Sequence, residues 1–156
     1  MCRVMSKKGS KLIYLDVCAL CRPFDDQSFL RIRVETEAVN LILSKVKERF
    51  YQMIVSPIHI KEIEAIQDEI EHIQLMILLN KYGKTVEVNL AKARKRAEEL
   101  VSLGFGIADA AHIAFAEEVK AEFISCDKRL VKKCIRHKIK VWCGNPLAFC
   151  EKEDLK

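Results

Sequence analysis

Apolar and polar positions follow two different periods along the chain. Short, almost continuous apolar runs predict buried strands, and they lie at residues 11–15, 52–55, 123–125 and 139–142. Between these runs, apolar residues recur every three to four positions, which predicts helices. The helices are expected at residues 29–50, 57–67, 68–82, 90–103, 107–119 and 128–137, with a short extended segment at residues 85–88.

Strands separated by helices predict a mainly parallel sheet that is covered by helices on both faces. This is the α/β class, here with four or five strands. The chain has no internal repeat, low-complexity tract or linker, so residues 1–156 are expected to form one domain, with flexible tails at residues 1–10 and 151–156.

Composition restricts the class of protein. Hydrophobic residues make up 50% of the chain and charged residues 31%, which is typical of a globular protein. The longest purely apolar run, Leu75–Leu79, is far shorter than the ~18 residues of a membrane span. The basic N-terminus lacks the pattern of a signal peptide. We therefore expect a cytoplasmic protein with no membrane partner, whose seven cysteines stay reduced.

Four carboxylates stand out by their position. Asp16 and Asp127 follow predicted strands, where α/β proteins bind their ligands. Glu62 and Asp109 lie near the starts of predicted helices, among apolar neighbours. Three of them have an ordinary alternative: Asp16 and Asp127 are also typical turn or helix-capping residues, and Glu62, taken alone, is typical of a solvated helix position.

Together the four acids predict a cation site. Two carboxylates about 5 Å apart repel by roughly 3 kcal/mol at an effective dielectric of ~20, so a group of them needs protons or cations. Oxygen ligands favour Mg²⁺ or Mn²⁺. The net charge of +5 suits a polyanion held by its phosphates, although a pI near 8.8 decides nothing by itself.

The segments around these acids are similar to those of the PIN domain, the PilT N-terminus family of metal-dependent nucleases. The similarity runs from Lys11 to about Pro146 with the acids in the family's order, and it is carried by residues 12–20, 55–63, 107–116 and 123–130. It implies a three-layer α/β/α fold with Asp16, Glu62, Asp109 and Asp127 as catalytic residues and ligands of Mg²⁺ or Mn²⁺.

The resemblance also implies a function. The expected activity is endoribonuclease hydrolysis of RNA phosphodiester bonds, leaving 5′-phosphate and 3′-hydroxyl ends. Small single-domain members resemble VapC-type toxins of type II toxin–antitoxin pairs. The implied partners are therefore an RNA substrate, an antitoxin protein and a second copy of the chain in a homodimer.

Two departures from the family pattern define the main alternative. Cys18 stands where many relatives have Asn, and Cys126 stands before the last acid, where relatives often have a polar or basic residue. No acid is missing, and Ser125 could orient Asp127 or a water on the metal. The alternative is a catalytically weak or inactive PIN-fold protein that binds RNA or serves as a scaffold.

Other motifs have weaker functional interpretations. Cys18 and Cys21 form a CxxC spacing, which would fit a thiol redox protein. His59 and His112 are interpreted as hydrogen-bonded helix histidines, not ligands. Arg22 and the basic run at residues 92–96 could hold phosphates, although both are also typical of solvated surface.

Overall fold

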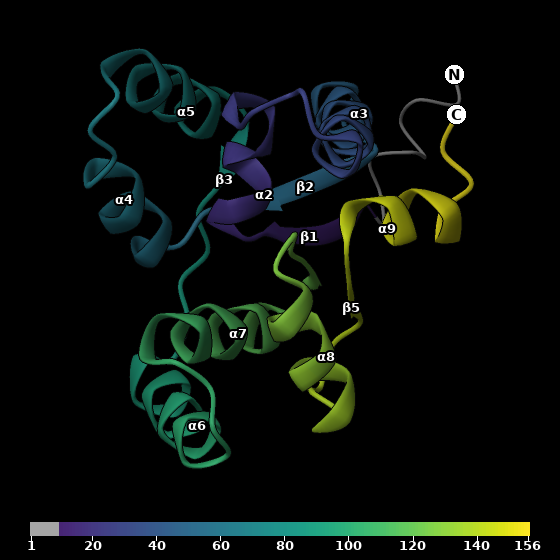
Figure 1. Cartoon of the computed structure of the whole chain (residues 1–156). Coiled ribbons are helices and arrows are strands. Elements are labelled where there is room, and N and C mark those ends of the chain that lie inside the picture. Colours follow the sequence, from purple (N-terminus) through teal and green to yellow (C-terminus); the bar gives the residue numbers. More distant parts are fainter. Residues whose placement is uncertain (1–9) are drawn as a thin grey trace, which may run out of the picture.

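A five-stranded, all-parallel sheet forms the centre of the molecule in the computed structural model, which describes residues 10–156 (Figure 1). The strand order is β3–β2–β1–β4–β5. This confirms the predicted α/β class, at the upper of the two strand counts. The strands are β1 (Lys11–Leu15), β2 (Tyr51–Ile54), β3 (Gly83–Lys84), β4 (Glu122–Ile124) and β5 (Cys143–Gly144).

Helices cover both faces of this sheet, which gives three layers (Figure 1). One layer contains α2, α3, α5 and α9, and the other contains α6, α7 and α8. Within residues 10–156 the α-helices are α2 (Val17–Cys21), α3 (Leu30–Lys47), α4 (Pro57–Glu64), α5 (Glu69–Tyr82), α6 (Leu90–Ser102), α7 (Ile107–Val119), α8 (Lys128–Arg136) and α9 (Pro146–Lys152).

The central position of β1 in the sheet explains why residues 12–15 are all apolar. Ile13 and Leu15 pack into the core beneath α3, whereas Tyr14 points to the opposite face and packs into the core beneath α7. All three side chains are fully buried. A parallel strand between two helical layers needs apolar residues at consecutive positions, so the run 12–15 is the signal of a strand without a solvent face.

The direction of winding reverses beside β1. The chain passes from β1 to β2 and β3, then returns across the sheet to place β4 on the other side of β1, with β5 beyond it. The Asp16 amide donates a hydrogen bond to the Ile124 carbonyl at 2.8 Å, which joins β1 and β4 at their carboxyl ends. Open α/β sheets bind ligands in the crevice at such a reversal.

Polar side chains cap the first turns of several helices. Ser56 caps α4, with Pro57 in the first helical position. The Asn89 side chain accepts from the Lys92 amide at the start of α6. These caps satisfy amides that have no partner inside the helix.

The two outer strands differ from the prediction. β3 is formed by residues 83–84, not 85–88, and β5 by residues 143–144, not 139–142. The apolar side chains that predicted strands there have a different role: Val86, Val88, Ile139 and Val141 pack against the core between the sheet and α6–α8. Their burial explains the pattern without any strand pairing.

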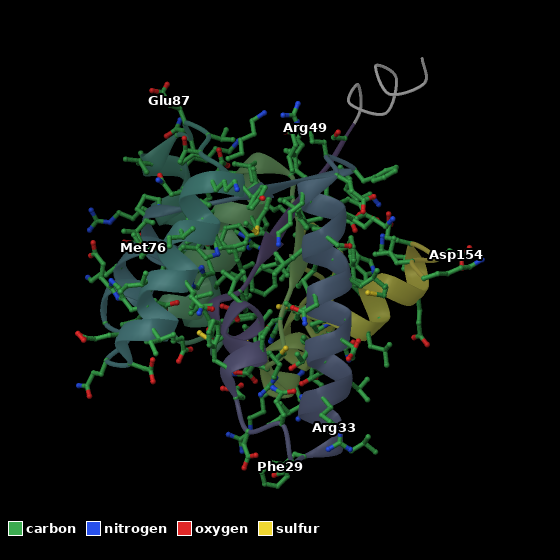
Figure 2. All side chains as sticks on the ribbon, turned by 90° about the horizontal axis from the view of Figure 1, so that it is seen from above. Phe29, Arg33, Arg49, Met76, Glu87 and Asp154 are labelled. Carbon is green, nitrogen blue, oxygen red and sulfur yellow. The ribbon has the colours of Figure 1, made fainter. Side chains whose placement is uncertain are left out.

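The C-terminal segment forms a helix that was not predicted. Asn145 caps α9 by accepting from the Ala148 amide at 2.7 Å, and Phe149 and Cys150 are buried. Met76 of α5 and Asp154 lie on opposite sides of α3 (Figure 2).

The predicted tail at residues 151–156 is packed against the domain. α9 runs through Lys152, and Glu153 accepts hydrogen bonds from Lys11 at 2.7 Å and from the Tyr51 hydroxyl at 3.0 Å. Of the other predicted tail, residues 1–9 lie outside the described part. Between residues 10 and 156, no helix combines the length and apolar character that crossing a membrane requires.

Candidate metal centre

Three side chains from separate elements meet at the carboxyl edge of the sheet. Asp16 follows β1, Glu62 lies on α4 and His112 lies on α7. One ligand atom from each lies within 4.8 Å of the other two. The His112 Nε2 atom is 2.8 Å from Glu62 Oε1 and 3.9 Å from Asp16 Oδ1. Asp16 and His112 are buried and Glu62 is 33% exposed, so the group could hold a metal ion and is open on the Glu62 side.

Local hydrogen bonds hold the Asp16 carboxylate in place. Oδ1 accepts from the Val17 amide at 2.8 Å, because Asp16 is the N-cap of α2. Oδ2 accepts from the Ser125 hydroxyl at 3.0 Å and from the Cys18 thiol at 3.3 Å. The predicted capping role of Asp16 and its placement in the acidic group are therefore compatible, because the cap fixes the direction in which the carboxylate points.

Ser125 connects two of the predicted acids. Its hydroxyl donates to Asp16 and accepts from the Asp127 amide at 3.0 Å. Asp127 itself is exposed, and its Oδ1 accepts from the Arg129 and Leu130 amides, so it caps α8. The other carboxylate oxygen of Asp127, Oδ2, makes no hydrogen bond within residues 10–156. It is therefore free to contact solvent.

The pKa of Asp109 reports the surrounding charge. This carboxyl is half-buried on the first turn of α7, and burial is the largest cause that raises its pKa. The negative charges of Asp16, Asp127 and Glu62 raise the pKa further, while His112 lowers it. The four predicted acids therefore act on one another electrostatically, and a cation among them would relieve this repulsion.

The structure separates the predicted residues into two sets. Asp16 and Glu62 belong to the compact donor group, whereas Asp109 and Asp127 lie around it. His112, interpreted from the sequence as a helix histidine, is the third member of the group. Its three-residue spacing from Asp109 places both on one side of α7, and this spacing was the available sequence signal.

Tyr14 fixes the orientation of the His112 ring. Its hydroxyl lies 2.5 Å from His112 Nδ1, and both residues are buried. Burial raises the pKa of Tyr14, and the charges of Asp16 and Glu62 raise it further, so the hydroxyl keeps its proton. A partner on the far nitrogen is the usual way in which proteins orient a metal-binding histidine.

A buried hydrogen-bond chain continues behind Tyr14. Its hydroxyl is 2.7 Å from the Ser56 hydroxyl, which lies 3.1 Å from His59 Nδ1. His59 Nε2 donates to the Leu15 carbonyl at 2.7 Å, so Nδ1 is the accepting nitrogen and takes the Ser56 amide at 3.0 Å. Burial, together with His112, lowers the pKa of His59 to about 4. His59 is therefore a neutral, hydrogen-bonded helix residue, as predicted.

The CxxC thiols lack the chemistry of a redox site. Burial raises the pKa of Cys18, and the charge of Asp16 raises it further. Burial likewise raises the pKa of Cys21 to about 12. Both are free thiols in the described part of the chain. Redox cysteines depend on a lowered thiol pKa, so these observations weigh against a thiol redox function.

Arg22 is held by its own neighbours. Its Nε atom is 3.0 Å from Glu35 Oε1, and NH1 is 2.9 Å from Asp25 Oδ2. Glu35 is also paired with Arg31, whose guanidinium donates to the Cys126 carbonyl at 2.9 Å. These contacts connect the loop after α2 with α3 and the turn before Asp127, which indicates a structural role for Arg22.

Comparison with known proteins adds no assignment. The chain matches no protein-family model and no curated protein. The resemblance to PIN domains therefore rests on the four sequence segments around the acids, together with a three-layer fold of the expected kind.

Proposed function

We propose that this protein is a divalent-metal-dependent ribonuclease whose metal lies among Asp16, Glu62 and His112. The observation that carries the proposal is their convergence. One ligand atom from the end of β1, one from α4 and one from α7 lie within 4.8 Å of one another, where the winding of the sheet reverses. Such convergence at the ligand-binding edge of an α/β sheet is typical of a functional site.

The chemistry of the donors fits a divalent cation. Two carboxylates and one imidazole supply oxygen and nitrogen ligands with enough negative charge to neutralise the ion. Burial is the largest cause of the raised pKa of Asp109, and the negative charges of Asp16, Asp127 and Glu62 add to it. An imidazole ligand favours a first-row transition metal over Mg²⁺, so of the two expected ions Mn²⁺ suits the group better.

The residues take separate roles under this proposal. Asp16 and Glu62 bind the cation, and His112 adds a nitrogen whose direction Tyr14 sets. Asp109 and Asp127, around the group, orient the attacking water and further cations. A divalent cation bound here would polarise the phosphodiester and make a nearby water more acidic.

The biological setting is a proposal from the resemblance. RNA as substrate, and 5′-phosphate and 3′-hydroxyl ends as products, follow from the similarity of the four acidic segments to PIN nucleases. A role as the toxin of a type II pair follows in the same way. It brings two further expectations, a homodimer and inhibition by a cognate antitoxin.

Metal binding and cleavage can be tested with one pair of variants. Asp109→Asn removes one negative charge from the acidic group, and Glu87→Gln removes one from an exposed position labelled at the periphery in Figure 2. We expect the wild type and Glu87→Gln to cleave single-stranded RNA with Mn²⁺ and to stop with EDTA.

Asp109→Asn should lose metal-dependent cleavage, because it removes one of the negative charges around the donor group. It should stay folded, because burial and then the neighbouring acids raise the pKa of Asp109, so that a neutral side chain is tolerated there. Thermal unfolding checks folding, and calorimetric titration with Mn²⁺ checks binding. Cleavage by Asp109→Asn at the wild-type rate would rule out the role of Asp109, and absence of Mn²⁺ binding by the wild type would rule out the metal site.

One observation supports the non-enzymatic alternative. Cys18 places a thiol 3.3 Å from Asp16 Oδ2, where many relatives have an amide. A wild-type protein that binds Mn²⁺ and RNA but cleaves neither single-stranded nor structured RNA would be the inactive RNA-binding or scaffold protein. Cleavage by a Cys18→Asn variant of such a protein would identify the thiol as the cause.

A further inference from the structure

Exposed basic side chains follow Asp127 in the chain, beside the candidate metal centre. From Lys128 to Cys150 the chain contains no acidic residue. Six basic side chains of this segment are exposed, and within residues 10–156 none of the six takes part in an ion pair. They are Lys128, Arg129, Lys132, Arg136, Lys138 and Lys140.

The basic run on α6 differs in this respect. Lys92 pairs with Glu118 at 3.8 Å and Arg94 pairs with Glu98 at 3.5 Å. Arg96 pairs with Glu117 at 2.7 Å. The run that the sequence singled out as a possible phosphate contact is thus largely neutralised by neighbouring acids. The unpaired positive charge lies on α8 instead.

The basic residues of α8 form a stripe along one side of the helix. Lys128, Lys132 and Arg136 are four residues apart, which places them on one face at steps of about 6 Å. Leu130 and Cys134 are buried on the opposite face, against the core. The stripe therefore points to solvent, and its spacing is of the order of the distance between neighbouring phosphates in an extended strand.

The first residue of the stripe, Lys128, directly follows Asp127 of the acidic group. Asp127 caps α8, and its charge contributes to the raised pKa of Asp109. A polyanion with one phosphate at the metal centre would be repelled by uncompensated acids and attracted by the adjacent cations of α8. The charge pattern therefore favours one direction in which a bound strand continues.

We infer that a single-stranded RNA leaves the metal centre along α8, with successive phosphates on Lys128, Lys132 and Arg136. The inference rests on the proposed ribonuclease function and adds the path of the substrate. A single stripe on one helix suits one strand rather than two. Contacts to phosphates carry no sequence information, so this track binds RNA of any sequence.

Two double variants test the track. Lys132→Gln/Arg136→Gln removes two charges from α8, and Lys92→Gln/Arg94→Gln removes two exposed charges from α6 as the matched control. Binding of a labelled single-stranded RNA is measured by fluorescence anisotropy in EDTA, between about 50 and 200 mM salt. EDTA prevents cleavage, so binding is measured without catalysis.

The α8 variant should bind RNA less tightly, and the slope of log K against log salt should become shallower by about 1.4, since each lost phosphate contact on a single strand accounts for about 0.7. The α6 variant should keep the wild-type slope. Thermal unfolding of both variants should match the wild type, because all four side chains are exposed.

Several outcomes would overturn the inference: no binding of RNA by the wild type, an unchanged slope for the α8 variant, or an equal loss for the α6 variant. If duplex RNA bound equally tightly through the same residues, the preference for a single strand would be wrong. If polyglutamate bound equally tightly, RNA would not be the specific partner.

Cleavage with Mn²⁺ separates this inference from the proposed function. Loss of RNA binding in the α8 variant without cleavage by the wild type would keep the track and refute the nuclease. Cleavage by the wild type with unchanged binding by the α8 variant would keep the nuclease and refute the track.

Discussion

Three residues of the central strand β1 are fully buried, Ile13, Tyr14 and Leu15. Of these, Tyr14 alone has a polar group on its side chain, the hydroxyl. It contacts His112 Nδ1 and the Ser56 hydroxyl, and through these it connects the metal centre with the interior. An orienting partner of this kind typically changes metal affinity about 10- to 100-fold. The position of the Tyr14 hydroxyl oxygen would therefore affect how tightly the candidate donor group could bind a metal ion.

Replacement of Tyr14 by Phe tests this role. We expect Mn²⁺ affinity to fall about 10- to 100-fold, because His112 loses the partner that fixes its ring. Calorimetric titration measures the affinity. Tyr51→Phe is the control, because its hydroxyl bonds Glu153, outside the donor group. Unchanged Mn²⁺ affinity in Tyr14→Phe would show that the hydroxyl does not support the metal centre.

The sequence revealed the acids of the site but not the complete set of donors. Asp16 could be predicted because it directly follows an apolar strand, and Glu62 because it lies early in a helix with a clear Ser56-Pro57 start. His112 could not be assigned, since its orienting partner Tyr14 is 98 residues away in the chain. A helix histidine becomes a ligand candidate only through such a contact.

The residue that caps helix α8 has two roles. Asp127 caps the helix through Oδ1 and contributes negative charge beside Asp109. Asn caps helices about as well as Asp but carries no charge. Variants at this one position can therefore separate the stability of α8 from the chemistry of the site.

We expect Asp127→Asn to lose cleavage activity and keep the wild-type free energy of unfolding. Asp127→Ala should also lose cleavage activity. Its free energy of unfolding should be lower by about 1 kcal/mol, because two amides of α8 lose their acceptor. Urea unfolding and an RNA cleavage assay measure the two effects. Full activity in Asp127→Asn would exclude a role for its charge.

Elements were predictable where one local pattern determines them. Strand β1 is apolar on both faces, and α4 and α6 begin at clear capping residues. Strands β3 and β5 have two residues each, which is too short for a periodic pattern. Helix α9 was missed because the charged residues after Phe149 indicated a tail, whereas Lys11 and Tyr51 bind Glu153 from another part of the chain.

The stability of the whole domain should depend on pH through His59. The ordinary pKa of 6.5 is lowered to about 4 in the folded protein, chiefly by burial. Between these values the unfolded chain binds the proton and the folded protein does not. The stabilisation is therefore complete above about pH 6.5 and is lost as the pH falls towards 4. The raised pKa of Asp109 acts in the opposite direction.

We expect the free energy of unfolding to fall by about 2 kcal/mol from His59 between about pH 7 and pH 5. Urea unfolding at both values measures the loss. His59→Gln, whose amide can still donate to the Leu15 carbonyl, should lose less over the same interval. The same loss in this variant would assign the effect to other groups.

The placement of β4 beside β1 determines when the candidate metal centre can form. Asp16 lies near one end of the chain and its neighbour Ser125 is 109 residues further on, yet both must be present before the donor group is fixed. A polypeptide still emerging from the ribosome has β1, β2 and β3 long before β4. If the proposed ribonuclease function holds, nascent chains should therefore lack cleavage activity until synthesis has passed this strand.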